Sequence, residues 1–279
     1  MIGQLLFAVI VGTWNGNWFP SGRAEHRAEA EVEAATIAKA GKMLREGIAK
    51  LDSELKEDVI LCLNEIRGPR VAKELAAATG ITNLQLAVIS GYRRRDRFDM
   101  QQDVILTTLP VASANWCLWK SSKGVLPPRG YARAAVVMPG AVTTSVYCVH
   151  LKSNYGDTTA AIKASNREKR RLPVEQLVQQ EKPKRGRKAT PVIIAGDFNS
   201  DPTKEEFKDE TIFGTLETAG FSDVVALLPE ERRWTHPNRK YGNTALDHIF
   251  LRGVEAFGEA ATEAPKGISD HYALFARLK

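Results

Sequence analysis

The sequence predicts an α/β protein in which two β-sheets pack together with helices outside them. Apolar runs typical of strands recur about nine or ten times along the chain, whereas only about four segments have helical periodicity. So many strands with so few helices fit two packed sheets better than one doubly wound sheet. The composition, 43% hydrophobic and 26% charged residues over 279 positions, is that of a globular protein.

The expected elements follow in chain order. An apolar run predicts the first strand at 5–13, and apolar positions near a 3.6-residue period predict an amphipathic helix over 28–55. A helix over 69–78 begins at Pro69 and is stopped by Gly80. Further strands are predicted at 58–64, 84–92, 104–108, 132–138, 144–151, 191–196, 247–251 and 272–278, and further helices at 165–180 and 208–220. We expect one domain over residues 1–279.

Composition also excludes several classes of protein. No apolar run reaches the roughly 18 to 20 residues that span a bilayer, so we expect a soluble chain, either cytoplasmic or secreted after loss of a leader. The run at 5–11 lacks a basic flank and a cleavage site, and it predicts a strand rather than a leader. Three cysteines, two of them in apolar runs, argue against a disulfide framework. We expect a monomer with no stable protein partner.

Polar residues stand where several predicted strands end or begin, which is where functional side chains gather. Taken singly, each has an ordinary explanation: Glu65 as a helix-N-terminal acid, His150 as a core histidine, Asp197 as a turn residue. Together they offer what a metal-dependent hydrolase needs, namely oxygen ligands for a hard cation and a group that takes a proton from water. This set comprises Asn15, Glu65, Asp197, Asn199, Asp270 and His271.

Six short segments contain these polar residues, in the order Thr13–Asn15, Asn64–Glu65, His150–Ser153, Gly196–Pro202, Leu246–Phe250 and Ser269–His271. Together they resemble the endonuclease/exonuclease/phosphatase superfamily, whose members include DNase I-like nucleases, abasic-site endonucleases, sphingomyelinases and inositol-phosphate phosphatases. The resemblance runs from about Phe7 to Leu278. It implies a four-layer α/β/β/α sandwich and phosphoester hydrolysis that depends on Mg²⁺ or Mn²⁺.

The resemblance also implies roles for the metal and water side of the site. Glu65 is expected to be the main metal ligand, with Asn15 and Asp270 beside the metal. Asp197 is expected to orient or deprotonate the attacking water, and Asn199 to hydrogen-bond the phosphoryl oxygens.

The two histidines and one arginine complete the implied site. His271 is expected to bind the scissile phosphate or act as base, with its partner acid left open between Asp99 and Gln102. His150 is expected to be the second histidine, held by Asp247. Abasic-site endonucleases have an asparagine where His150 stands, which argues against that branch. Arg133 resembles the arginine that grips the phosphate in the DNase I-like branch.

Strand direction predicts which basic loops face this site, which matters more than the net charge of +6. The strand at 84–92 should run toward Glu65, so that Arg95 and Arg97 in its exit loop meet the substrate. The loop at 232–241 should lie there too, with Arg233 and Trp234 suited to a phosphodiester backbone and stacked bases. The basic run at 182–188 precedes the strand whose far end carries Asp197, so it should lie about 20 Å from the metal.

These patterns predict an endonuclease of low sequence specificity that hydrolyses DNA, with RNA as a further substrate. The alternative is a phosphatase or a sphingomyelinase-like phospholipase, for which Trp116, Leu118 and Trp119 could form an apolar docking loop or else belong to the core. A scaffold that has lost its chemistry is disfavoured, because no expected catalytic position is substituted.

Overall fold

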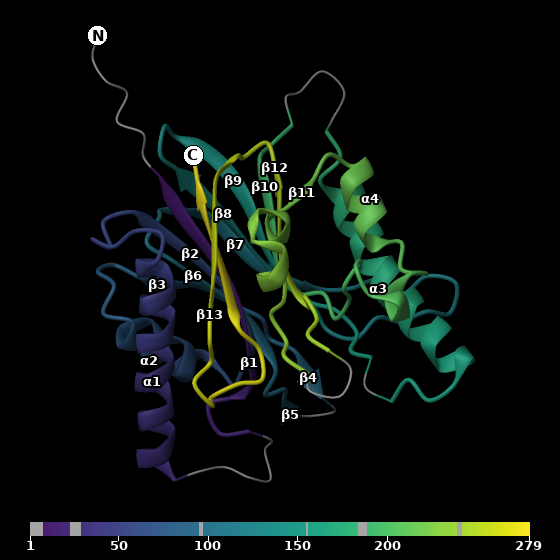
Figure 1. Ribbon diagram of the computed structural model, residues 1–279, viewed down its shortest axis with the longest axis horizontal. Coiled ribbons are helices and arrows are strands. Elements are labelled where there is room, and N and C mark those ends of the chain that lie inside the picture. The colour runs from purple at the N-terminus through teal and green to yellow at the C-terminus, as the bar shows by residue number, and fades with distance from the viewer. Residues whose placement is uncertain (1–7, 23–28, 95–96, 155, 184–188, 239–241) are drawn as a thin grey trace.

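Two six-stranded sheets pack face to face in the computed structural model, and helices cover both outer faces (Figure 1). The structure describes residues 8–22, 29–94, 97–154, 156–183, 189–238 and 242–279. The layers follow the predicted α/β/β/α order. Within the described residues, no helix combines the length and the apolar character needed to cross a membrane.

The first sheet is mixed, because its central strand β1 runs parallel to β2 and antiparallel to β14. Two helices, α1 (Ala30–Ala49) and α2 (Pro69–Ala78), cover its outer face, where Leu44 and Leu75 pack with Phe275 in one buried cluster. From edge to edge the strands are β13 (Ala256–Glu263), β14 (Ala273–Leu278), β1 (Val9–Phe19), β2 (Asp58–Ile66), β6 (Gln102–Thr107) and β3 (Gln85–Ile89).

The second sheet is also mixed, with β10 parallel to β9 and antiparallel to β12. Its outer face carries α3 (Ala160–Gln180) and α4 (Ile212–Thr218), and Leu177 packs there with Tyr147 and Phe250. From edge to edge the strands are β11 (Ser222–Asp223), β12 (Asp247–Arg252), β10 (Val192–Asp197), β9 (Val142–His150), β8 (Gly130–Met138) and β7 (Val111–Leu118). Smaller elements are β4 (Arg93–Arg94), β5 (Arg97–Phe98), η2 (Glu205–Phe207), η3 (Val224–Leu227) and η4 (Glu230–Arg232).

The main core lies between the sheets, and strand alternation decides which side chains enter it. On β9, Val146 and Cys148 belong to the inter-sheet cluster, whereas Tyr147 and Val149 belong to the outer cluster beneath α3. Since successive side chains point to opposite faces, a strand covered on both faces must be apolar throughout. This is why the central strands read as continuous apolar runs.

Four central strands end at one end of the sandwich, which we call the rim. Asn15 of β1 pairs with Asn64 of β2, and Asp197 of β10 pairs with His150 of β9. Strand β12 is antiparallel to β10, so Asp247 opens it at the same end. The predicted polar strand ends therefore converge at the rim.

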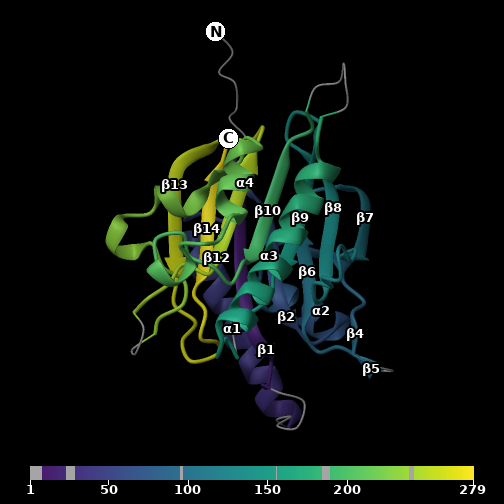
Figure 2. The ribbon, with the colours of Figure 1, turned by 90° about the vertical axis from the view of Figure 1, so that its right-hand side faces the viewer.

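The edge strands are where the sequence prediction fails. Strands β7 and β13 were not expected, and Figure 2 shows them at opposite sides of the sandwich. Strand β7 is largely exposed and β13 is mostly half-buried, and small or polar residues interrupt both, so neither has the continuous apolar run of a central strand. The helix expected at 208–220 is shorter, because residues 205–207 form the separate turn η2 and α4 begins only at Ile212.

Candidate active site

Unusual backbone conformations aim the polar side chains at the rim. Glu65 has φ of 60° at a shift in the pairing of β2 with β6, and Asn199 has φ of 51°. Bulges and left-handed residues of this kind redirect side chains and gather at functional sites. Gly196 has φ of 145°, and a Cβ there would lie 1.9 Å from the Val149 carbonyl oxygen, so only glycine fits. This allows β10 to deliver Asp197 close beside β9.

Glu65, His150 and Asp197 form the buried centre of the site. The His150 Nε2 atom lies 3.7 Å from Glu65 Oε1 and 3.6 Å from Asp197 Oδ2. Asn15 donates its Nδ2 to Asp197 Oδ2 at 2.8 Å, and the Asn199 backbone N–H donates to Asp197 Oδ1 at 2.8 Å. Both oxygens of Asp197 are therefore held by donors, which fixes the orientation of this carboxylate.

His271 is paired with Asp247, across the two sheets. Its Nδ1 lies 2.7 Å from Asp247 Oδ2, and the Thr235 hydroxyl donates to the same oxygen at 2.7 Å. The prediction that Asp247 holds His150 is therefore wrong. The sequence left Asp99 and Gln102 open as partners of His271. Both instead make hydrogen bonds to residues of their own segment, between Ser90 and Gln102, and the partner of His271 is Asp247.

The electrostatics separate the roles of the ionisable groups. Burial acts to lower the pKa of His271, but the charge and hydrogen bond of Asp247, with the charges of Asp197 and Asp270, raise it to about 10. Burial raises the pKa of Asp197 to about 6, with the charge of Asp247 adding to it and His271 opposing. Burial, and then the charge of Arg129, lowers the pKa of His150 well below its ordinary value. At neutral pH the site thus holds a charged His271, an ionised Asp197 and a neutral His150.

The segment before β14 is locked to the rim by several hydrogen bonds. The Ser269 hydroxyl donates to the Asn15 carbonyl oxygen at 2.7 Å and accepts from the His271 N–H at 3.0 Å. Trp14 donates its indole Nε1 to the His271 carbonyl oxygen at 3.2 Å. Asp270 stands between Ser269 and His271 in the chain, and about half of its side chain is exposed.

His236 also reaches the site, and it belongs to the loop at 232–241 that the sequence predicted to lie there, although no role was predicted for its side chain. Its Nε2 lies 3.6 Å from Asp270 Oδ2, and its ring centre lies 5.0 Å from that of His271. Thr235, the preceding residue, hydrogen-bonds Asp247, so this loop is fixed to β12. The only signal in the sequence was that the loop at 232–241 precedes a strand that leaves the rim.

The donor atoms at the rim fit a hard divalent cation. Carboxylate oxygens of Glu65 and Asp197 approach the same histidine, and Mg²⁺ needs only one or two carboxylates while keeping several waters. Carboxylate oxygens of Asp197 and Asp247 lie within 4.8 Å of each other, whereas His271 is bonded to Asp247 and keeps its proton, so it is not counted as a ligand. Asn15 donates its amide N–H to Asp197, and its amide oxygen accepts the Asn17 N–H, so both ends of this side chain are engaged by the protein.

The prediction that Arg133 grips the phosphate is wrong. Arg133 pairs with Tyr147 in the ladder of β8 and β9, on the face opposite to His150. Its guanidinium donates to the Tyr147 hydroxyl at 3.1 Å and to the Ser145 hydroxyl at 2.9 Å. Arg129, just before β8, is a cation that faces the site. Its charge adds to burial in lowering the pKa of His150, and it opposes the burial that raises the pKa of Asp103 to about 7. Strand alternation alone does not say which face of β8 is inward.

The basic loops are only partly as expected. Strand β3 is antiparallel to β6, which is antiparallel to β2, so β3 runs toward the rim as predicted and the β4–β5 hairpin lies at that end. Arg97 belongs to β5, and Arg95 lies outside the described residues.

The substrate contacts expected of Arg233 and Trp234, in the loop at 232–241, are not supported. Arg233 donates to the Leu228 and Ala226 carbonyl oxygens, and Trp234 packs against Tyr272 with its indole bonded to the Glu231 carbonyl oxygen.

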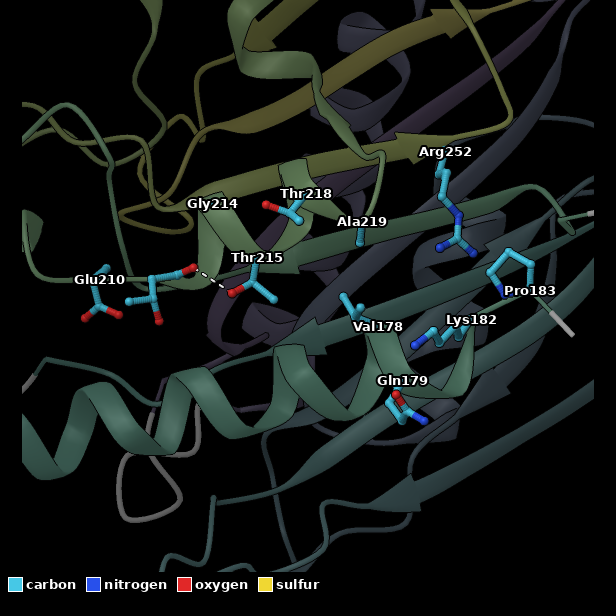
Figure 3. Close-up of a pocket in the computed structure, with 11 residues that line it drawn as sticks. Val178, Gln179, Lys182, Pro183, Glu210, Gly214, Thr215, Thr218, Ala219 and Arg252 are labelled. Atoms are coloured by element: carbon cyan, nitrogen blue, oxygen red, sulfur yellow. Dashed lines mark hydrogen bonds between the residues drawn. The ribbon is translucent and has the colours of Figure 1, made fainter. Parts of the chain in front are cut away.

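A separate groove of about 750 Å³ lies between α3 and α4 (Figure 3). Arg252 lines it at the end of β12 that is opposite to Asp247, and Lys182 lies in the same groove. Lys182 therefore lies toward the end of the sheet that is opposite to the rim, as predicted. Residues 184–188 of the basic run lie outside the described residues.

Comparison with known proteins identifies one family. The model of the endonuclease/exonuclease/phosphatase family matches residues 12–271. None of the curated proteins compared with the chain matches it.

Solved structures of the same fold span nearly the whole chain. A humanized D. rerio TDP2 with 14 mutations is 16% identical with a TM-score of 0.63, over 98% of this chain and 99% of that one. D. rerio TDP2 complexed with single strand DNA product is 15% identical with a TM-score of 0.62 and the same coverage. Sphingomyelinase C from Streptomyces griseocarneus is 16% identical with a TM-score of 0.62, again over 98% and 99%. At these identities the likeness shows the fold alone.

Proposed function

The chain belongs to the endonuclease/exonuclease/phosphatase family, a family of phosphoester hydrolases, and on that premise we propose that it is a metal-dependent endonuclease of low sequence specificity that hydrolyses DNA. The observation that carries the hydrolytic part is the arrangement of Asp197 beside Glu65 and His150, with the Asp247–His271 pair next to it.

The side chains divide the work of hydrolysis among them. Asp197, ionised at neutral pH and held by Asn15 and Asn199, takes a proton from the water that attacks phosphorus. His271 keeps its proton because Asp247 stabilises the imidazolium, so its Nε2 can hold a phosphoryl oxygen as negative charge develops. His150, neutral at this pH, offers a hydrogen bond to another phosphoryl oxygen.

Glu65 is the residue proposed to hold the metal, with Asp270 beside it. When bound, Mg²⁺ or Mn²⁺ supplies positive charge that polarises the phosphoryl oxygen. The Trp18 backbone N–H donates to Glu65 Oε2 at 2.9 Å and leaves Oε1 facing the centre of the site. This single fixed carboxylate suits a cation that keeps most of its water ligands.

Positive charge near the rim supports a polyanionic substrate. Arg93 opens the β4–β5 hairpin and is exposed, Arg129 flanks His150, and Lys152 lies two residues beyond the end of β9. Cations in these positions suit the phosphates on either side of a scissile bond. One protein with this fold was solved with a single-strand DNA product.

A lipid phosphodiester is the second candidate, and one observation favours it. Strand β7 ends at the rim with Trp116 40% exposed and Leu118 60% exposed, and Leu126 in the next loop is 64% exposed. Apolar side chains of this kind can enter a membrane surface. Trp119, in contrast, is buried against Tyr131 and belongs to the core.

A substrate comparison tests the proposal. The purified chain is assayed with Mg²⁺ and with EDTA on supercoiled DNA, on vesicles of choline phospholipid and on a phosphomonoester. The proposal expects nicked DNA in Mg²⁺ and intact DNA in EDTA. Faster cleavage of the phospholipid than of DNA would favour the lipid phosphodiester as the substrate. Full activity in EDTA would contradict the assignment of a metal ion to the site.

A further inference from the structure

A buried amide ties the two catalytic strands of the second sheet to the first sheet. Asn64, which precedes Glu65, is fully buried. Its Oδ1 accepts the Asp197 backbone N–H at 3.0 Å, and its Nδ2 donates to the Val149 carbonyl oxygen at 3.1 Å. One side chain thus fixes the backbone at Asp197 and just before His150.

Asp103 on β6 completes the hydrogen bonding of this amide. Asn64 Nδ2 also donates to Asp103 Oδ1, at 2.7 Å. The carboxyl oxygen of Asp103 accepts this bond, so Asp103 holds the amide with its N–H groups on one side and its oxygen toward Asp197. The other carboxylate oxygen of Asp103 accepts the Tyr92 hydroxyl at 2.8 Å, and the Asp103 N–H donates to the Ser90 hydroxyl at 2.9 Å.

These groups form a buried hydrogen-bonded chain that leads from Tyr92 to the site, with a side branch through Ser90 to Gln102. Tyr92, Asp103 and Asn64 are each 2% exposed or less, and the chain ends on the Asp197 N–H. A second hydrogen-bonded group, on the outer face of the second sheet, offers a contrast. It joins Tyr131 through Gln180 to Tyr147, and among the described residues its side chains make no hydrogen bond to Glu65, His150, Asp197 or His271.

We propose that Tyr92 and Asp103 are positioning residues of the active site, acting through Asn64 on the backbone of Asp197 and Val149. This inference rests on the proposed hydrolytic function. A displacement of about 1 Å in a reacting group can lower a rate about 10²-fold, so a small loss of order in Asn64 should reach the chemistry.

Matched tyrosine variants test the proposal. Tyr92→Phe removes the hydroxyl that donates to Asp103. Tyr131→Phe is the control, because it removes a hydroxyl from another buried tyrosine, one that donates to Gln180. kcat and KM are measured on a small phosphodiester in Mg²⁺, below the melting temperature of each variant. We expect Tyr92→Phe to lower kcat about 10-fold with KM within about twofold, and Tyr131→Phe to leave both unchanged. Equal kcat for Tyr92→Phe and the wild type would overturn the proposal.

Two further measurements keep the outcome decisive. Asp103→Ala should lower kcat more than Tyr92→Phe, and Asp103→Asn should recover most of the loss, because its side-chain oxygen still accepts from Asn64. If Asp103→Ala does not fold, Tyr92→Phe and Asp103→Asn decide. Hydrogen exchange at the Asp197 amide gives a readout without turnover, and it should be faster in Tyr92→Phe than in Tyr131→Phe. Should the wild type cleave no phosphodiester, the proposed function fails, while unchanged exchange would sink the positioning role itself.

Discussion

Two histidine–aspartate pairs lie at the start of β12, on opposite faces of the second sheet. Both histidines are buried, whereas Asp223 is partly exposed. On the inner face Asp247 holds His271 at 2.7 Å, and on the outer face Asp223 holds His248 at 2.7 Å. The second nitrogen of His248 is also satisfied, by the Ser200 and Ala245 carbonyl oxygens at 3.0 and 2.8 Å. The second nitrogen of His271 instead faces Asp197 and Asp270 at 4.0 and 3.9 Å, too far for hydrogen bonds.

The contrast shows that the pair alone does not make a catalytic group. His248 has its Nδ1 and Nε2 committed to protein acceptors and stacks on Phe250, so it can only stabilise the fold. His271 has one nitrogen committed and one open at the rim, so it can bind a phosphoryl oxygen. Changes at the rim should therefore act on turnover, and changes around His248 on stability.

The largest effects are expected from the two acids at the centre of the site. Asp197→Asn removes the group proposed to take the proton of water, and Glu65→Gln removes the charge proposed to hold the metal. Each should lower kcat by about 10²- to 10⁴-fold or more, with KM changed far less for Asp197→Asn. Steady-state kinetics across a Mg²⁺ titration check this. A Glu65→Gln enzyme with an unaltered response to Mg²⁺ would contradict the metal assignment.

The pH dependence of turnover should report both rim groups. Asp197 must be ionised to accept a proton, so kcat/KM should rise with pH through about 6. His271 must be protonated to hold the phosphate, so kcat/KM should fall as pH passes about 10. His271→Ala should lose the upper limb of the profile and keep the lower one. An upper limb that persists in His271→Ala would assign it to another group.

The outer pair should appear in stability rather than turnover. Burial acts to lower the pKa of His248, but the charge and hydrogen bond of Asp223 and the two carbonyl oxygens raise it to about 9, from 6.5. The stability that the folded protein gains from protonated His248 is fully present below pH 6.5 and is lost as pH rises through 9. It amounts to roughly 3 kcal/mol of unfolding free energy, at about 1.4 kcal/mol per pKa unit. Urea melts of His248→Gln should therefore lie well below wild type at pH 6, with a smaller gap at pH 10.

The smallest effects concern substrate binding. Replacing Arg93 and Arg129 together by alanine should raise KM on DNA and flatten its salt dependence by about one unit per lost phosphate contact. Arg133→Ala is the control, because that guanidinium is bonded to Tyr147 and Ser145 on the outer face. Equal salt slopes for the double variant and wild type would argue against DNA as the substrate.

The sequence could predict the features of this site that depend on a single strand, but not the contacts between residues of two different sheets. Glu65, Asp197 and His271 could be placed at the rim because each follows or precedes an apolar run, and the end of a buried strand is a local feature. The partner of His271 could not, because Asp247 opens a strand of one sheet and His271 precedes a strand of the other. That contact depends on how the sheets pack.

Side-chain direction was the second limit. Arg133 lies in a strand that is apolar on both faces, so alternation fixes its neighbours but not which face looks inward. Arg129 comes from the turn before that strand, with φ of 61°, a conformation that no repeat in the sequence marks. The fold was more accessible, since the central strands and α2 depend on local apolar pattern and on proline and glycine positions.

The most direct test compares one chemical change in the two pairs. Asp247→Asn and Asp223→Asn each replace a histidine's carboxylate partner by an amide of the same shape. kcat on DNA in Mg²⁺ is measured for both variants at a temperature where melting curves show both folded. We expect Asp247→Asn to lose about 10²-fold or more in kcat, whereas Asp223→Asn should keep wild-type kcat and melt at a lower temperature. Loss of turnover in Asp223→Asn with full turnover in Asp247→Asn would contradict the assignment of His271 to the active site.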